Sequence, residues 1–153
     1  MNASAQALSV SVVGKIANIS TIFQAQFPSA SVDFSPWVLD EKAQAQFDPD
    51  SVDIAFSFPS WQPPLGCGCV LLQVYFSGDI QSPSRTLRKI KMTGHDYRGQ
   101  HWWFSTYTNC QGDYQFSGSC IPSDEGKRQF ESVINQLRTL FGAPLPSPMQ
   151  QES

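Results

Sequence analysis

The stretch VDIAFSFPSWQPPLGCGCVLLQVYF, residues 52–76, decides the fold class. Alternate residues at its start are apolar and would share one side of a strand: Val52, Ile54, Phe56 and Phe58. Such alternation predicts a half-buried β-strand with its other face toward solvent. The loop SWQPPLG then breaks this strand. The run 69–76, apolar except for Gln73, predicts a central strand that is buried on both faces.

Further strands are expected on the C-terminal side of this stretch. Residues 87–93 carry alternating lysine and arginine side chains, which discourage pairing with other chains, so they are predicted to form an edge strand. Residues 102–107 alternate well enough for another strand, and residues 113–116 for a short one. Because the connections are short and polar, we expect an antiparallel sheet of four to five strands.

Helical patterns precede the strands. Apolar residues recur every three or four positions at Leu8, Val12, Ile16, Ile19, Phe23 and Phe27. This stripe predicts an amphipathic helix over about residues 5–27, which Pro28 ends. Ser35 followed by Pro36 is typical of a helix start and predicts a second helix that runs to Phe47.

The C-terminal helix has the clearest pattern. Ser123 suits an N-cap, and the acids Asp124 and Glu125 suit the positive end of the helix dipole. One apolar stripe follows, made of Phe130, Val133, Ile134, Leu137 and Phe141. Gly142 and Pro144 then end the helix.

Helices, then strands, then a helix predict one α+β domain over residues 1–142, followed by a disordered tail at 143–153. We expect the N-terminal helices and the C-terminal helix to pack on the antiparallel sheet. The C-terminal helix should press against the strand at 52–58 and the strand at 69–76. A length of 153 residues fits a single domain.

The overall charge is low. Charged residues make up 15% of the chain and the net charge is -3, against a typical charged share of about 25%. Either a Gln- and Ser-rich surface or a partner that covers part of the surface would account for this. The N-terminus lacks a basic signal region, and no apolar run approaches the roughly 18 residues of a membrane span. A cytoplasmic location is expected, with peripheral association to a membrane complex left open.

The bases and the tryptophans suggest a binding surface. Residues 85–98 contain five bases and one acid. Trp61 lies in a proline-rich loop, and the adjacent Trp102 and Trp103 should face opposite sides of a strand. Tryptophan and arginine are enriched at binding hot spots. We therefore predict a partner-binding set made of Trp61, Arg88, Lys89, Lys91, Trp102 and Trp103.

Cysteine and histidine offer the main chemical alternative. The candidate metal ligands or redox groups are Cys67, Cys69, His95, His101, Cys110 and Cys120. Zinc ribbons pair cysteines two to four residues apart, whereas these pairs are separated by one and by nine residues, so buried packing thiols are favoured. No P-loop, GxGxxG, GxSxG or HExxH motif is present. An enzymatic role and a cofactor are therefore not expected.

Three functions remain as hypotheses. The favoured one is a non-catalytic accessory domain that binds another protein or protein complex. The first alternative is a metal-binding or redox site built from the cysteines and histidines. The second is an anionic ligand or RNA held by the basic segment at 85–98 with a tryptophan as a stacking platform. The acidic net charge argues against nucleic acid.

Four segments, DPDSVDIAFSFPSW, PLGCGCVLLQVYF, YRGQHWWFSTY and LRTLFG, resemble a group of small cyanobacterial proteins of unknown function. The resemblance covers about residues 48–142. It implies an accessory protein of photosynthesis or carbon acquisition. One such protein is the small soluble subunit of the carbon-dioxide-uptake NAD(P)H dehydrogenase-like complex, although no motif ties the chain to that subunit. The group brings no catalytic residues to carry over.

Overall fold

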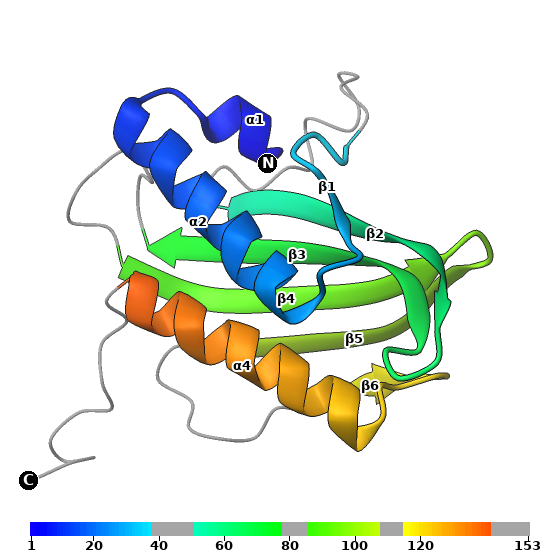
Figure 1. Cartoon of the computed structure of the whole chain (residues 1–153). Coiled ribbons are helices and arrows are strands. Elements are labelled where there is room, and N and C mark those ends of the chain that lie inside the picture. Colours follow the sequence, from blue (N-terminus) through cyan, green and yellow to red (C-terminus); the bar gives the residue numbers. More distant parts are fainter. Residues whose placement is uncertain (38–50, 78–85, 108–114, 142–153) are drawn as a thin grey trace, which may run out of the picture.

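A six-stranded antiparallel sheet forms the centre of the molecule, and helices cover one of its faces (Figure 1). The computed structural model describes residues 1–37, 51–77, 86–107 and 115–141. The strands lie in sequence order: β1 (Ser31–Asp33), β2 (Ser51–Gln62), β3 (Cys67–Ser77), β4 (Thr86–Asp96), β5 (Gly99–Tyr107) and β6 (Ser117–Gly118). The predicted α+β class is confirmed. The sheet has one strand more than the expected maximum, because the three-residue β1 was not predicted.

The helices described are α1 (Ala3–Gln6), α2 (Val10–Gln26) and α4 (Asp124–Leu140). The single helix predicted over 5–27 is therefore two helices. The break has a local cause: Ser9 is extended, and its side chain accepts a hydrogen bond from the backbone N–H of Val12, which caps α2. Leu8 consequently lies in the link and is 75% exposed, outside the buried stripe.

Several predicted elements fall partly or wholly outside the described residues. Residues 35–37 belong to neither helix nor strand, and the remainder of the helix predicted to run to Phe47 is not described. The tail at 143–153 is likewise not described. Of the short strand predicted at 113–116, only residues 115 and 116 are described, and they are irregular; strand β6 begins directly after them.

The segment SWQPPLG, residues 60–66, is a loop only in its second half, which corrects part of its prediction. Strand β2 continues to Gln62, with a shift of its register against β3 between Ser57 and Gln62. Only the turn after Gln62 is irregular, and it closes at Gly66 with a φ of 65°. A Cβ at this position would overlap the backbone carbonyl of Cys120. The turn therefore needs glycine for both its conformation and its close packing.

Strand β4 is internal, which corrects its prediction as an edge. It pairs with β3 on one side and with β5 on the other. Its lysines, Lys89 and Lys91, are half-buried and lie on the sheet face opposite the helices. Their alternation therefore marks a polar face of the strand and not an edge of the sheet. Strand β3 is central, as predicted, but only one of its faces is wholly buried: on the other, Cys69, Leu71 and Gln73 are half-buried.

The core lies between the sheet and α2 with α4. Phe23 of α2 stacks on Phe56 of β2 at 3.9 Å between ring centroids. On α4, Phe130 contacts Trp102 of β5 at 5.3 Å. Of the two strands expected to meet the C-terminal helix, the strand at 52–58 is instead contacted by α2 through Phe56. The contact with the strand at 69–76 is present, because Phe141 at the end of α4 packs on Phe76 at 5.0 Å. None of the described helices has the length and apolar character needed to cross a membrane.

Candidate functional site on the open face of the sheet

The sheet face opposite α2 and α4 is not covered by any described helix (Figure 1). Cross-strand partners lie side by side on one face, so the register defines its surface. One row runs from the buried Asp53 through Gln73 and Lys91 to Ser105, and the next contains Thr93 and Trp103. We call this surface the open face. Its polar and aromatic composition contrasts with the aliphatic and aromatic face beneath the helices.

A cation–aromatic cluster occupies one end of the open face. The register of β3 against β4 shifts between Tyr75 and Phe76. A shift of this kind lets two residues of one strand lie opposite one residue of its partner. The guanidinium of Arg88 lies 5.5 Å from the Tyr75 ring centroid, and Nζ of Lys89 lies 4.4 Å from it. Both distances are within the range of cation–π interactions.

A cavity of about 350 Å³ lies beside this cluster. It is lined by Lys89, Lys91, Thr93, Gln100, Trp103 and Ser105. Trp103 is 45% exposed and gives the cavity an apolar wall. The lysines supply positive charge, and the hydroxyl and amide groups can donate or accept hydrogen bonds. This combination suits a ligand that has an anionic group next to an apolar one.

The two histidines lie at the other end of the open face. Nε2 of His95 and Oγ1 of Thr93 are 2.6 Å apart. Nε2 of His101 lies 2.8 Å from Oδ1 of Asp96, within ion-pair distance but without hydrogen-bond alignment. Burial, together with the neighbouring His101, lowers the pKa of His95 below its ordinary value. Neutral imidazole is therefore the favoured form of His95 near neutral pH.

Arg98 dominates the electrostatics of this end. Its side chain donates to Oδ2 of Asp96 at 2.7 and 3.0 Å, and its backbone N–H donates to Oδ1. These bonds hold the pKa of the Asp96 carboxyl well below its usual range. Trp61 contacts the ring of His101 edge-on at 5.2 Å and lies 5.6 Å from the Arg98 guanidinium. The cluster is internally paired, which is typical of a structural role.

The structure brings most of the predicted partner-binding set together. Arg88, Lys89, Lys91 and Trp103 lie on the open face, with Trp61 at its end. The sixth residue, Trp102, is withdrawn from the set because it is wholly buried and donates its indole N–H to the carbonyl of Leu65 at 2.8 Å. The prediction that the two adjacent tryptophans face opposite sides is confirmed.

Several residues of this surface were not predicted, among them Tyr75, Thr93, Gln100 and Ser105. The alternation along the two strands could have identified Thr93 and Ser105, because they continue the series of Lys91 and Trp103. Tyr75 is the last residue but one of the apolar run at 69–76, and it reads there as a core residue. No sequence signal marks Gln100.

The cysteines form no recognisable site among the described residues. Cys67 is buried, and burial raises the pKa of its thiol to about 12. Cys69 and Cys120 are half-buried free thiols, and Cys110 lies outside the described residues. In the described part of the chain, no three His, Cys, Asp or Glu side chains are grouped so that they could hold a metal ion.

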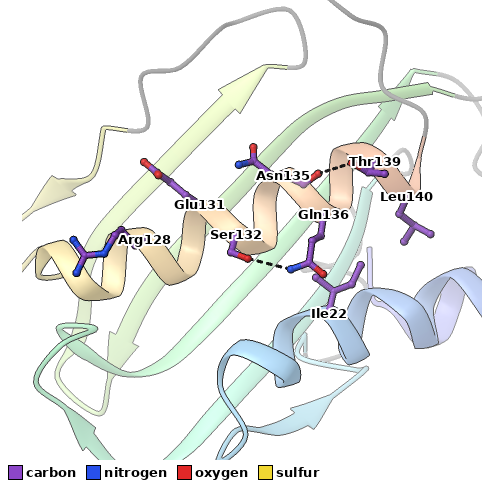
Figure 2. A pocket seen from close by; sticks show the side chains of 8 residues that line it. All are labelled: Ile22, Arg128, Glu131, Ser132, Asn135, Gln136, Thr139 and Leu140. Carbon is purple, nitrogen blue, oxygen red and sulfur yellow. Dashed lines mark hydrogen bonds between the residues drawn. The ribbon is translucent and has the colours of Figure 1, made fainter.

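A second hollow, of about 730 Å³, lies over the groove between α2 and α4 (Figure 2). Gln26 and Gln136 both donate to Oγ of Ser132, at 3.2 and 3.1 Å. Gln129 also donates to the carbonyl of Gln26 at 3.1 Å. Figure 2 shows Ile22 of α2 beside Gln136 of α4. The bonds of Gln26 and Gln129 link the two helices, so the groove is explained by helix packing.

Comparison with known proteins identifies a family but no function. No curated protein and no solved structure matches the chain. A family model described as a domain of unknown function matches residues 4–143. Since this match covers most of the chain, the protein belongs to that family of domains of unknown function.

Proposed function

We propose that the protein is a non-catalytic protein-binding domain whose open face binds an acidic segment of a larger protein or complex. The observation that carries this proposal is the cavity in which Lys89, Lys91 and the exposed Trp103 meet. Aromatic residues are enriched at the centres of protein interfaces, and tryptophan is enriched among hot spots. The lysines give the surface a preference for negative charge.

The local charge supports an acidic ligand. The charges of the carboxylates nearest this surface are compensated: Oδ2 of Asp53 lies 2.8 Å from the N-terminal ammonium, and Asp96 is held by Arg98. A short acidic segment responds mainly to charges within about 8–10 Å, the screening length in physiological salt. Lys89 and Lys91 therefore determine how strongly the cavity attracts an acidic segment.

A protein ligand is favoured over nucleic acid because of the charge of the whole chain. Nucleic-acid binding neutralises many phosphates at once, whereas this protein has a net charge of -3. The metal or redox alternative has less support, because the Cys67 thiol stays protonated and a protonated thiol is a poor ligand and nucleophile.

The resemblance to small cyanobacterial proteins supports a particular setting. The partner would belong to a photosynthetic or carbon-uptake complex. The domain would then be a soluble subunit or assembly factor, cytoplasmic and peripheral to a membrane complex. This setting requires no catalytic residue in the domain itself.

Affinity capture from a native extract tests the proposal. A variant that combines Lys89→Glu, Lys91→Glu and Trp103→Ser should lose a stoichiometric partner that the wild-type protein retains. Capture should also weaken as salt is added, since screening reduces attraction between opposite charges. The control variant Tyr97→Ser changes an aromatic residue that is 95% exposed and lies outside the cavity; it should retain the partner.

Two results would contradict the proposal. One is retention of the same partner by the triple variant. The other is a bound species that nuclease removes and whose affinity falls steeply with salt, which would assign the surface to nucleic acid. Circular dichroism melts of each variant establish that loss of binding is not loss of folding.

A further inference from the structure

The outer surface at the start of α2 is unusually apolar. Leu8, Val10 and Val13 are 75%, 90% and 49% exposed. They are neighbours in the chain, and Ala17 continues the exposed surface one turn further along the helix. Single exposed aliphatic residues are ordinary, but a contiguous group is typical of an interaction site.

A groove lies next to these projecting side chains. It has a volume of about 340 Å³ and is lined almost entirely by apolar atoms of α1, α2 and Phe34. Among the lining residues are Ala3, Ala7, Val13 and Ala17. Figure 1 shows α1 beside the N-terminal half of α2, and residues of both helices line the groove. The same surface thus has both projecting apolar side chains and an apolar hollow.

Gly14 lies within this surface and is otherwise unexplained. It occupies the interior of a 17-residue helix, where glycine is unfavourable relative to alanine. A Cβ at Gly14 would meet no atom within 4 Å, so packing inside one chain does not require glycine. A neighbouring helix that crosses at this point would require it, because small residues permit close approach of backbones.

We propose that a second copy of this chain covers the surface, so that Leu8 and Val10 of each copy enter the groove of the other. A two-fold interface uses the same patch on both copies, and the patch must therefore be self-complementary. Adjacent projections and a hollow meet that condition. The interface is separate from the open face, because α2 lies on the opposite side of the sheet (Figure 1).

The charge of this region is compatible with self-association. Residues 1–32 contain no Asp or Glu and a single base, Lys15. The Lys15 ammonium lies 3.3 Å from Oγ of Ser11 on the same helix. Near a two-fold axis, identical charged side chains of the two copies meet and repel each other. This surface has almost no charged side chains, so little repulsion opposes the dimer. A membrane surface is less well matched, since interfacial helices use several cations and aromatic anchors.

Sedimentation velocity over a wide range of protein concentration tests this proposal on the full chain. The wild-type protein should pass from monomer to dimer as concentration rises. Val10→Glu and Val13→Glu should each remain monomeric across that range, because they place a carboxylate in the apolar interface. Ile121→Glu is the matched control, since Ile121 is an exposed aliphatic residue outside the patch; it should dimerise like the wild type.

Three outcomes would overturn the proposal. The wild-type protein could sediment as a monomer at every concentration. The Val10→Glu variant could dimerise as strongly as the wild type, which would place the interface elsewhere. A monomer that floats with lipid vesicles, and loses that property in Val13→Glu, would assign the patch to a membrane. Since Val10 is almost fully exposed, its substitution should leave the thermal melt of the monomer unchanged.

Discussion

Helices α2 and α4 have the same length, 17 residues, and lie beside each other on one face of the sheet. Each begins at a serine whose side chain accepts a backbone N–H, Ser9 for α2 and Ser123 for α4. Their outer surfaces differ. Helix α4 has six charged residues, whereas α2 has only Lys15. The exposed apolar side chains Val10 and Val13 lie at the start of α2, and a contiguous exposed apolar group is typical of an interaction site.

The difference separates folding from association. The inner stripes of both helices form one core around Phe23 and Phe130, so both helices are needed for a stable monomer. The outer surface of α4 is already suited to water. The outer surface of α2 exposes Val10 and Val13 to water, and we expect another apolar surface to cover them. The substitutions below compare matched positions on the two helices.

The largest effects are expected at the inner phenylalanines. Phe23→Ala and Phe130→Ala should each lower the free energy of unfolding by about 3–5 kcal/mol, as for other fully buried aromatic residues. Both side chains are 0% exposed and contact rings on the sheet. Urea unfolding measures the loss. A mild effect of Phe23→Ala beside a severe effect of Phe130→Ala would show that α2 is not part of the shared core.

The next effect concerns Gly126, which is buried in the first turn of α4. A Cβ there would overlap the backbone carbonyl of Pro64. Gly126→Ala should therefore destabilise the protein by about 1–3 kcal/mol, the usual cost of overpacking, despite the better helix propensity of alanine. Urea unfolding of Gly126→Ala beside the wild type measures this loss. A stabilised variant would mean that α4 does not approach the turn after β2 this closely.

The contrast between α2 and α4 also shows what the sequence could predict about the fold. For α4, the cap, the first-turn acids and the apolar stripe all indicated the same helix, and its bounds were predicted closely. For α2, the stripe was correct from Val12 onward, but Ser9 acts as a cap within the predicted helix. The pattern of β4 was compatible with an edge strand or with a strand that has one polar face. The choice between these two interpretations depends on which strands pair with β4, and a local sequence pattern does not show which strands those are.

The candidate site was predictable only in part, for the same reason. Lys89, Lys91 and Trp103 could be grouped because alternation places them on strand faces. The position of Tyr75 beneath two cations depends on a register shift that no local pattern indicates. Trp61 and His101 are forty positions apart in the chain, and only the folded sheet brings them into contact.

The caps should contribute a smaller and nearly equal amount. Ser9→Ala and Ser123→Ala should each cost about 1 kcal/mol, within the range of 0.5–2 kcal/mol for N-cap removal. Ser123 should be the costlier of the two, because its hydroxyl also donates to the carbonyl of Pro64 at 3.2 Å. Thermal melts at fixed concentration measure both, with Ser→Asp replacements as controls that keep a capping oxygen. An equal loss in the Asp variants would show that capping is not the cause.

Gly14→Ala should have the opposite sign to Gly126→Ala. With open space around the new methyl group, the free energy of unfolding of the monomer should rise by about 0.5–1 kcal/mol through helix propensity. Sedimentation of the same variant should show weaker dimerisation, because the methyl group would separate the crossing helices. A variant that is more stable and dimerises as well as the wild type would remove Gly14 from the interface.

The smallest effect is expected at the outer surface of α4. Glu131→Ala should change the free energy of unfolding by no more than about 0.5 kcal/mol, as for most surface substitutions. Glu131 is the suitable outer position, since Arg138 donates to Oγ1 of Thr106 at 3.3 Å. Val13→Ser on α2 should be equally mild in dilute solution. At high concentration it should lower the melting temperature relative to the wild type, because association stabilises only the protein that dimerises. If both variants matched the wild type at every concentration, the outer surfaces of the two helices would be energetically equivalent.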